Sequence, residues 1–132
     1  WGVTAENADD LTLAINELEA EHDQQGTWRK RVNYFLQHDY QPLYAYMDTW
    51  LMLKAPSFDV VHQWRLEQEQ KLAKACKDKI AGSNSIMSPM QVGEFVQYFQ
   101  RLTEHGLKTL PDKVDILLEL DSNRNIIASN GL

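Results

Sequence analysis

The sequence predicts a domain of the α/β class, in which helices flank a buried and mainly parallel sheet. The run "TWLMLKA" (49–55) is short, largely apolar and bounded by Asp48 and Pro56, as is typical of a strand covered on both faces. A second such run, "VDILLEL" (114–120), lies near the end of the chain. Segments with helical spacing of apolar residues precede the first run and separate the two.

A first helix is expected to begin at Asp9 or Asp10, either of which can serve as its N-cap. Its apolar positions recur at helical spacing, with acidic residues opposite, and are Leu11, Ala14, Ile15 and Leu18. The polar stretch "HDQQG" (22–26) that follows is typical of a loop.

Thr27 is the expected N-cap of a second helix. The apolar face of this helix comprises Trp28, Val32, Phe35, Leu36 and Tyr40. Pro42 either kinks this helix or begins a new short one, because proline interrupts the hydrogen bonding of a helix interior.

Two more helices are expected after the first strand. Ser57 can cap the first of them, which is expected to continue to about Ala81 and to end at Gly82. Ser88, followed by proline and then by Gln91, combines a capping box with a proline at the first helical position, so the second helix starts there. Its buried stripe comprises Val92, Phe95, Val96, Phe99 and Leu102.

The end of the chain is expected to form a hairpin, because "DSNRN" (121–125) has turn composition and "IIAS" (126–129) can pair back on the preceding strand. Two or three strands are too few for a complete α/β core. The chain also opens on Trp1, without a basic and apolar leader. We therefore expect residues 1–132 to form a single segment of a longer protein.

Composition and charge argue against several classes of protein. The net charge of −6 at pH 7, with many acids near the N-terminus, argues against nucleic-acid binding. No run is apolar for long enough to span a bilayer, so no membrane partner is expected. The one cysteine, Cys76, permits no internal disulfide, which favours the cytoplasm.

Motifs for several common chemistries are absent from the sequence. It contains no GxxxxGK(S/T) or GxGxxG phosphate loop and no GxSxG nucleophile elbow. The four histidines show no i,i+4 pairing, which argues against a helical metal site: His22, His38, His62 and His105. Cys76 is expected to be a bystander thiol. Asp121 could bind a metal or act as a base at a strand end, but its surroundings favour a turn.

The segment "LKAPSFDVVHQWRLEQEQKL" (53–72) is the strongest functional candidate, because it is too polar for a helix that only lines a core. Two interpretations of Arg65 remain open. In the first, Arg65 pairs with Glu69 on a solvated helix face. In the second, the helix projects the guanidinium over a site at the end of the strand, where its forked donors would clamp phosphate oxygens.

Extended to "LMLKAPSFDVVHQWRLEQEQKL" (51–72), this segment resembles the region after a late core strand in P-loop kinases of the D-glycerate 3-kinase type, relatives of uridine kinase, phosphoribulokinase and pantothenate kinase. The most distinctive part of the likeness is Trp-Arg-Leu-x-x-Glu, made by Trp64, Arg65, Leu66 and Glu69. Residues 18–33, 38–48 and 88–126 are similar to further parts of these kinases, so the likeness extends over nearly the whole chain.

The resemblance implies the C-terminal, lid-bearing part of a P-loop NTPase-type parallel sheet with flanking helices. The Walker A lysine and the acidic base belong to the half that this sequence lacks, so no catalytic residue is assigned and the isolated chain is expected to be inactive. ATP, Mg²⁺ and a small hydroxylated metabolite are the implied ligands, with glycerate suggested by the family's name. Arg65 would close over the nucleotide, and Arg29 and Asn33 would face the acceptor. A non-catalytic, α-rich interaction module derived from such a kinase is the alternative.

Overall fold

The computed structural model describes residues 2–76 and 86–131. Its sheet has three strands in the order β1 (Leu51–Lys54), β2 (Ile116–Leu120) and β3 (Ile126–Asn130). β1 and β2 pair in parallel, whereas β2 and β3 form an antiparallel hairpin. The predicted helix-rich α/β class is confirmed, with a small mixed sheet in place of a purely parallel one.

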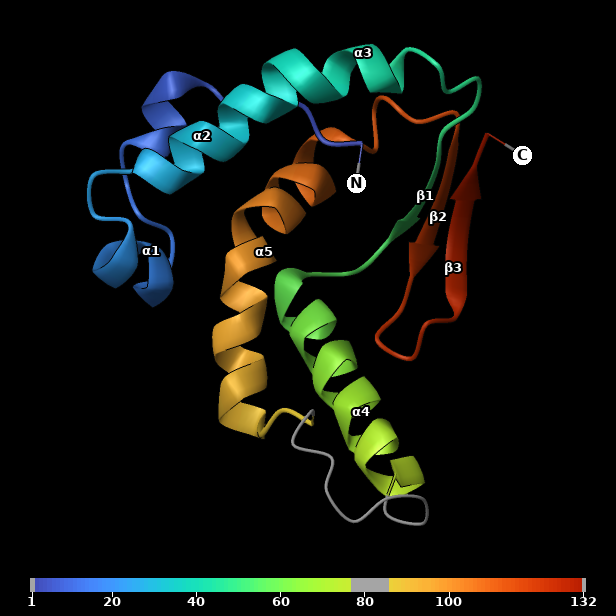
Figure 1. Ribbon diagram of the computed structural model, residues 1–132. Helices are drawn as coiled ribbons and strands as arrows, with labels where there is room; N and C mark the ends of the chain where they lie inside the picture. The colour runs from blue at the N-terminus through green and yellow to red at the C-terminus, as the bar shows by residue number, and fades with distance from the viewer. Residues whose placement is uncertain (1, 77–85, 132) are drawn as a thin grey trace.

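Two long helices, α4 (Phe58–Cys76) and α5 (Pro89–Thr109), lie side by side with the sheet to one side of them. Figure 1 shows α2 (Thr27–Phe35) and α3 (Gln41–Tyr44) running across one end of this pair. The short α1 (Glu17–His22) packs against α5. Within the described residues, no helix is both long enough and apolar enough to cross a membrane.

The starts of both long helices follow the sequence prediction. The Ser57 hydroxyl oxygen accepts a hydrogen bond from the Val60 amide at 3.3 Å, one turn into α4. Ser88 and Gln91 form the predicted reciprocal capping box at the start of α5, with proline at the first helical position. The predicted end of α4 near Ala81 and Gly82 lies outside the described residues.

The single first helix predicted from Asp9 or Asp10 is wrong. A 3₁₀ turn (Ala8–Leu11) is followed by an irregular, non-helical stretch, and α1 begins only after Asn16. The Asn16 side chain accepts a hydrogen bond from the Glu19 amide at 2.9 Å, which makes it the N-cap. The helical spacing of apolar residues therefore spans two elements, because the segment is shaped by its contacts with α5 rather than by its own periodicity.

The predicted N-cap of α2 is off by one residue. Gly26 holds that position with a φ of 69°, a left-handed conformation that glycine adopts without a steric penalty, and Thr27 is the first helical residue. The capping oxygens come from Asp23, whose carboxylate accepts from the amides of Trp28 at 2.8 Å and Arg29 at 3.0 Å. An aspartate four residues upstream of the helix therefore replaces the hydroxyl of Thr27.

Of the two alternatives for Pro42, the structure shows the second, a new short helix with the proline near its start. The helix widens into a π-helical segment (Leu36–Tyr40) ahead of the proline, and α3 then begins with proline in its first turn. Proline has no amide hydrogen and its ring crowds the carbonyl four residues earlier, so a wider turn accommodates it without breaking the helix. The chain consequently continues in one direction along the top of the molecule (Figure 1).

The β1 strand is present where predicted, but it is not buried on both faces. Leu51 is 53% exposed and Leu53 is 60% exposed, while the alternate residues of the strand are partly covered. All five residues of β3 are exposed as well. Among the described residues, one face of the sheet is therefore uncovered and apolar at β1.

The core lies mainly along α5. The most deeply buried apolar side chains are those of Val3, Leu11, Leu36, Ala55, Val92 and Val96. Two of these, Val92 and Val96, belong to the predicted stripe on α5, whereas Phe95 of the same stripe is 38% exposed. Gly106 is buried against the N-terminal segment, since a Cβ placed there would lie 2.9 Å from Val3 Cγ1.

Candidate functional site

Arg65 lies in the middle of α4 and contacts both its own helix and α5. Its Nη1 is 2.6 Å from Glu69 Oε2, one turn further along the helix. Its guanidinium carbon is 5.5 Å from the centre of the Phe95 ring, within range of a cation–π contact. The side chain is 26% exposed. The structure thus contains the pairing with Glu69, and contact with phosphate stays a prediction.

Glu69 does not lie on the solvated helix face that its spacing suggested. Its side chain is buried, and Oε1 accepts a hydrogen bond from the Met87 amide at 2.7 Å. The Met87 amide and the Arg65 guanidinium together hold the pKa of Glu69 below its ordinary value of 4.5. The Arg65–Glu69 pair therefore fastens the segment that precedes α5 onto α4.

Trp64 anchors α4 to the β2–β3 hairpin. Its indole Nε1 donates a hydrogen bond to the Ser122 carbonyl oxygen at 2.7 Å, and the Arg124 guanidinium carbon lies 5.0 Å from the centre of its ring. Glu67 bridges two cations, with its oxygens 2.6 Å from Lys71 Nζ and 2.6 Å from Arg124 Nη2. The polar face of α4 is thus turned towards the hairpin.

A shallow hollow of about 490 Å³ lies on this polar face of α4. Its lining combines one aromatic ring with three cations and consists of Val61, Trp64, Arg65, Gln68, Lys71 and Arg124. Guanidinium and ammonium groups around an aromatic ring can contact an anion such as a phosphate. The hollow is the place in the described chain where the predicted lid arginine meets further basic residues.

Asp121 follows β2 and serves the hairpin turn. Its Oδ1 accepts from the amides of Asn123 and Asn125, both at 2.8 Å, and Oδ2 accepts from the Asn125 side chain at 2.9 Å. The hydrogen bonds from Asn125 and Asn123 lower the pKa of Asp121 below its ordinary value of 3.8. Its contacts are those of the turn residue that the surrounding sequence favoured.

Arg29 is buried at the start of α2 and is surrounded by acceptors. Its Nε donates to the Leu11 carbonyl at 2.7 Å, Nη2 donates to the Thr12 carbonyl at 3.3 Å, and Nη1 lies 3.3 Å from Asp23 Oδ2. Burial alone would raise the pKa of Asp23, but the amide hydrogen bonds and the Arg29 guanidinium lower it below its ordinary value of 3.8. These contacts give Arg29 a structural role, and its contact with an acceptor substrate stays a prediction.

Asn33 lies one turn beyond Arg29 and holds the backbone of Glu6. Its Oδ1 accepts from the Glu6 amide at 2.7 Å, and its Nδ2 donates to the Glu6 carbonyl at 3.1 Å. These two hydrogen bonds resemble those that a neighbouring strand would make with Glu6. The side-chain amide of Asn33 is therefore already hydrogen-bonded to the backbone of the same chain. Arg29 and Asn33 share one region, and Arg65 belongs to another.

Arg101 is the organising residue that the sequence did not single out. It lies on α5, buried, and its Nε and Nη2 grip the two oxygens of Glu19 at 2.8 and 2.7 Å. It also donates to the carbonyls of Asp10 at 3.0 Å and Leu13 at 2.8 Å. An arginine between glutamine and leucine on a helix gives no signal by itself, because its partners are more than 80 positions away in the sequence.

The electrostatics of this cluster differ between its two acids. Burial alone would raise the pKa of Glu19, but hydrogen bonds from Arg101 and the Ile15 amide lower it below the ordinary value of 4.5. Burial raises the pKa of Glu6, and the opposing charges of Arg101 and His105 do not fully offset it. Glu19 is therefore the matched counterion of Arg101, and Glu6 is not.

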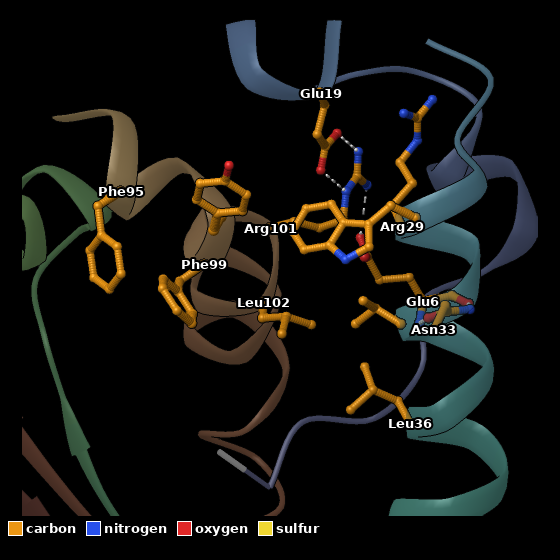
Figure 2. Close-up of a pocket in the computed structure, with 12 residues that line it drawn as sticks. Glu6, Glu19, Arg29, Asn33, Leu36, Phe95, Phe99, Arg101 and Leu102 are labelled. Carbon is orange, nitrogen blue, oxygen red and sulfur yellow. Dashed lines mark hydrogen bonds and ion pairs between the residues drawn. The ribbon is translucent and has the colours of Figure 1, made fainter. Parts of the chain in front are cut away.

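These residues close one end of a cleft of about 390 Å³ between α2 and α5 (Figure 2). Its walls are mostly aromatic and aliphatic: Trp28, Val32, Leu36, Phe95, Tyr98, Phe99 and Leu102. Trp28 and Tyr98 meet edge to face, with ring centres 5.6 Å apart. Pockets of this size and lining are typical of sites for small molecules.

Metal ligation finds no support in the part of the chain that the structure describes. No group of three or more histidine, cysteine, aspartate or glutamate side chains lies close enough there to hold an ion. The four histidines lie in four different helical segments: His22 in α1, His38 in the π-helical segment, His62 in α4 and His105 in α5.

Comparison with known proteins points to kinases. No protein-family model matches the chain. The uncharacterized kinase mug58 of Schizosaccharomyces pombe is 35% identical over 91 residues, which cover 65% of this chain and 30% of that protein. D-glycerate 3-kinase from Cryptococcus neoformans var. grubii is similar in structure, with a TM-score of 0.67 at 20% identity, over 98% of this chain and 46% of that one.

The chain thus spans less than half the length of each of these proteins. The structural match includes nearly all of the chain, and the sequence match, found independently, is to a protein named a kinase. The resemblance predicted from the sequence is confirmed at the level of the fold. The chain has the fold of one portion of D-glycerate 3-kinase.

Proposed function

We propose that the chain is part of an ATP-dependent kinase that phosphorylates a hydroxyl group of a small metabolite, with glycerate as the first acceptor to test. The observation that carries the proposal is the structural match to D-glycerate 3-kinase over 98% of the chain. The 35% identity to a second protein named a kinase supports it. The single cysteine, which permits no internal disulfide, supports the proposal of a cytoplasmic location.

The phosphate-binding loop of such an enzyme would come from outside this chain, because the sequence contains no GxxxxGK(S/T) motif. Mg²⁺ is expected in the complete enzyme, yet the described residues bring together no set of ligands for it. The contribution proposed for this chain is to cover the nucleotide and to complete the acceptor side.

Arg65 is the proposed lid residue. On closure its guanidinium would exchange Glu69 for phosphate oxygens, and Glu69 would keep the hydrogen bond from the Met87 amide. Lys71 and Arg124 line the same hollow and would add positive charge. Arg29 and Asn33 remain proposed on the acceptor side, although the contacts described above already engage their polar atoms.

The test is ADP release by the complete protein that carries this chain, with Mg-ATP and a panel of hydroxy acids, polyols and nucleosides. We expect stimulation by one acceptor class, with glycerate first. Arg65→Ala should lower kcat at least tenfold, and Arg65→Lys should recover only part of it because lysine lacks the fork. Lys74→Ala, an exposed cation on the same helix, is the matched control and should leave kcat unchanged.

Two outcomes would contradict the proposal. If no hydroxyl compound stimulates ADP release, the alternative of a non-catalytic interaction module derived from a kinase replaces it. If the Arg65→Ala enzyme keeps full turnover and loses only stability, Arg65 is a structural residue of α4. The isolated 132-residue chain should show no appreciable Mg-ATP binding by titration calorimetry, and micromolar binding would show that the nucleotide site lies within it.

A further inference from the structure

Arg124, in the turn between β2 and β3, has a backbone conformation that arginine adopts only at a steric cost. Its φ is 69°, and within residues 2–76 and 86–131 it is the one residue other than glycine with a positive φ. This left-handed region suits glycine and, to a lesser extent, asparagine, because the Cβ of other residues crowds the following carbonyl oxygen. Such strain is typical of residues whose side chain has a function.

The turn itself does not need the Arg124 side chain. Its side-chain hydrogen bonds join Asp121 to Asn123 and Asn125, and Arg124 adds only its amide, which donates to the Asp121 carbonyl at 3.0 Å. The side chain leaves the turn and pairs with Glu67 of α4. The two side chains are 43% and 40% exposed, and exposed ion pairs contribute little to stability. The pair with Glu67 therefore does not account for the strain.

The Arg124 guanidinium lies at the hollow on the polar face of α4. Its central carbon is 5.0 Å from the centre of the Trp64 ring, which is itself fixed by the hydrogen bond from Nε1 to the Ser122 carbonyl. Trp64 and Arg124 both line this hollow, together with Arg65 and Lys71. The turn thus adds a second arginine to the hollow that contains the proposed lid residue.

The cations of this hollow outnumber the carboxylates that pair with them. Among the described residues, the lining contains three cations and no carboxylate. Glu69, outside the lining, is the partner of Arg65. Glu67 alone is the partner of both Lys71 and Arg124. Within the described part of the chain, Arg124 uses only Nη2 for this pair, so its Nε and Nη1 keep N–H donors for a further anion.

We propose that Arg124 is a second phosphate-binding arginine, which acts with Arg65 on the phosphate chain of the nucleotide. The inference rests on the proposed function, which supplies the nucleotide as the ligand of this hollow. Two guanidinium forks bind the oxygens of two phosphate groups, which a monophosphate or a single carboxylate does not offer. Arg124 stays over the Trp64 ring and turns from Glu67 to the phosphate oxygens, and Glu67 stays paired with Lys71.

The experiment measures binding to the complete protein that carries this chain, by titration calorimetry with three probes: Mg-ATP, tripolyphosphate and adenosine. Arg124→Gly removes the guanidinium and relieves the strained backbone. We expect it to weaken Mg-ATP and tripolyphosphate by about tenfold or more, as for the loss of one charge-assisted contact, and to leave adenosine unchanged. Its Tm should stay the same or rise, because glycine adopts this φ freely.

Glu67→Gln should change binding in the opposite direction. It removes the carboxylate that competes for Arg124, so Mg-ATP should bind a few-fold more tightly. Lys74→Ala, which removes an exposed cation of α4 outside the hollow, is the control and should leave all three probes unchanged. Arg124→Asn also suits a left-handed position and is the second variant if glycine loosens the turn; it should bind the probes as Arg124→Gly does.

Unchanged tripolyphosphate binding in both Arg124 variants would overturn the inference, and so would a wild-type protein that binds neither Mg-ATP nor tripolyphosphate. A lower Tm with equal weakening of all three probes would also overturn it, because Arg124 would then be a structural residue. Binding needs no acceptor, so the proposed reaction is judged separately. A protein that no hydroxyl compound stimulates, but whose Arg124→Gly variant loses tripolyphosphate affinity, contradicts only the reaction, whereas an active kinase with unchanged affinity contradicts only the second arginine.

Discussion

The strongest structural prediction concerns the two acids around Arg101. Glu19→Gln keeps the shape of the side chain but removes the matched counterion of a buried guanidinium. Removing one partner of a buried pair costs about 3–5 kcal/mol, and we take the lower end because Glu6 stays 3.4 Å from Arg101. An unfolding entropy of about 2.1 cal/mol/K per residue gives about 0.28 kcal/mol/K for 132 residues. The expected loss of Tm is therefore about 11 °C.

Glu6→Gln is the matched comparison, and we expect it to change the stability in the opposite direction to Glu19→Gln. Burial raises the pKa of Glu6, so its charge opposes folding, and the neutral glutamine should leave the chain equally or more stable at pH 7. That advantage should shrink as the pH falls towards 4.5, because Glu6 of the folded wild type, with its raised pKa, binds its proton before that pH is reached. The lowered pKa of Glu19 works the other way, since its contribution is complete above pH 4.5 and is lost as the pH falls further.

The assay is thermal unfolding at several pH values, followed by circular dichroism at one fixed protein concentration. Replacing both partners, as Glu19→Gln with Arg101→Met, should recover part of the stability that the single Glu19 change loses. The reasoning is refuted if Glu19→Gln melts within 2 °C of the wild type, or if Glu6→Gln costs as much as Glu19→Gln.

Four further substitutions test individual contacts by urea or thermal unfolding. Gly106→Ala should cost about 1–3 kcal/mol of stability through overpacking, because the new Cβ would lie 2.9 Å from Val3 Cγ1. Gly93→Ala should instead stabilise α5, because its new Cβ would meet nothing nearer than His62 Nε2 at 4.0 Å. Equal effects of the two substitutions would contradict the overpacking argument. Trp64→Phe should cost about 1 kcal/mol by removing the 2.7 Å bond to the Ser122 carbonyl, and an unchanged unfolding curve would show that this bond contributes nothing. Asp23→Asn keeps a capping side chain but loses the negative charge beside Arg29, so it should destabilise the chain at pH 7. The variant should match the wild type once the pH falls well below 3.8, because Asp23 of the wild type is then also neutral. A difference in stability that persists in acid would mean that the substitution changed the cap and not only the charge.

Local signals in the sequence predicted the elements that are held by local interactions. The capping box at Ser88, the hydroxyl cap at Ser57 and the turn around Asp121 each depend on residues within four positions, and all three are present. The strands at 51–54 and 116–120 follow from short apolar runs. The fold class could be predicted from these elements and their order.

The first 30 residues could not be predicted in the same way. Their apolar spacing suggests one helix, but the backbone there is held by side chains from distant elements, such as Gln97, whose side chain accepts from the Leu18 amide at 2.9 Å. Neither Arg101 nor Glu6 belongs to a motif, because what makes them a cluster is a set of contacts across 82 to 95 positions. For the same reason, only the resemblance pointed to Arg29 and Asn33, and the structure assigns them contacts within the chain.

The long reach of Arg101 also bears on how quickly this chain can fold. The N-terminal segment has few contacts of its own, and its hydrogen bonds to Arg101 close loops of 82 to 95 residues. Strand β1 likewise can pair only with β2, which lies 65 positions later in the sequence. Closing such loops costs entropy before any contact compensates for it, and chains dominated by distant contacts fold slowly. During synthesis, the acidic N-terminal segment would therefore leave the ribosome long before its partner on α5 exists, and its order would be established only when α5 emerges.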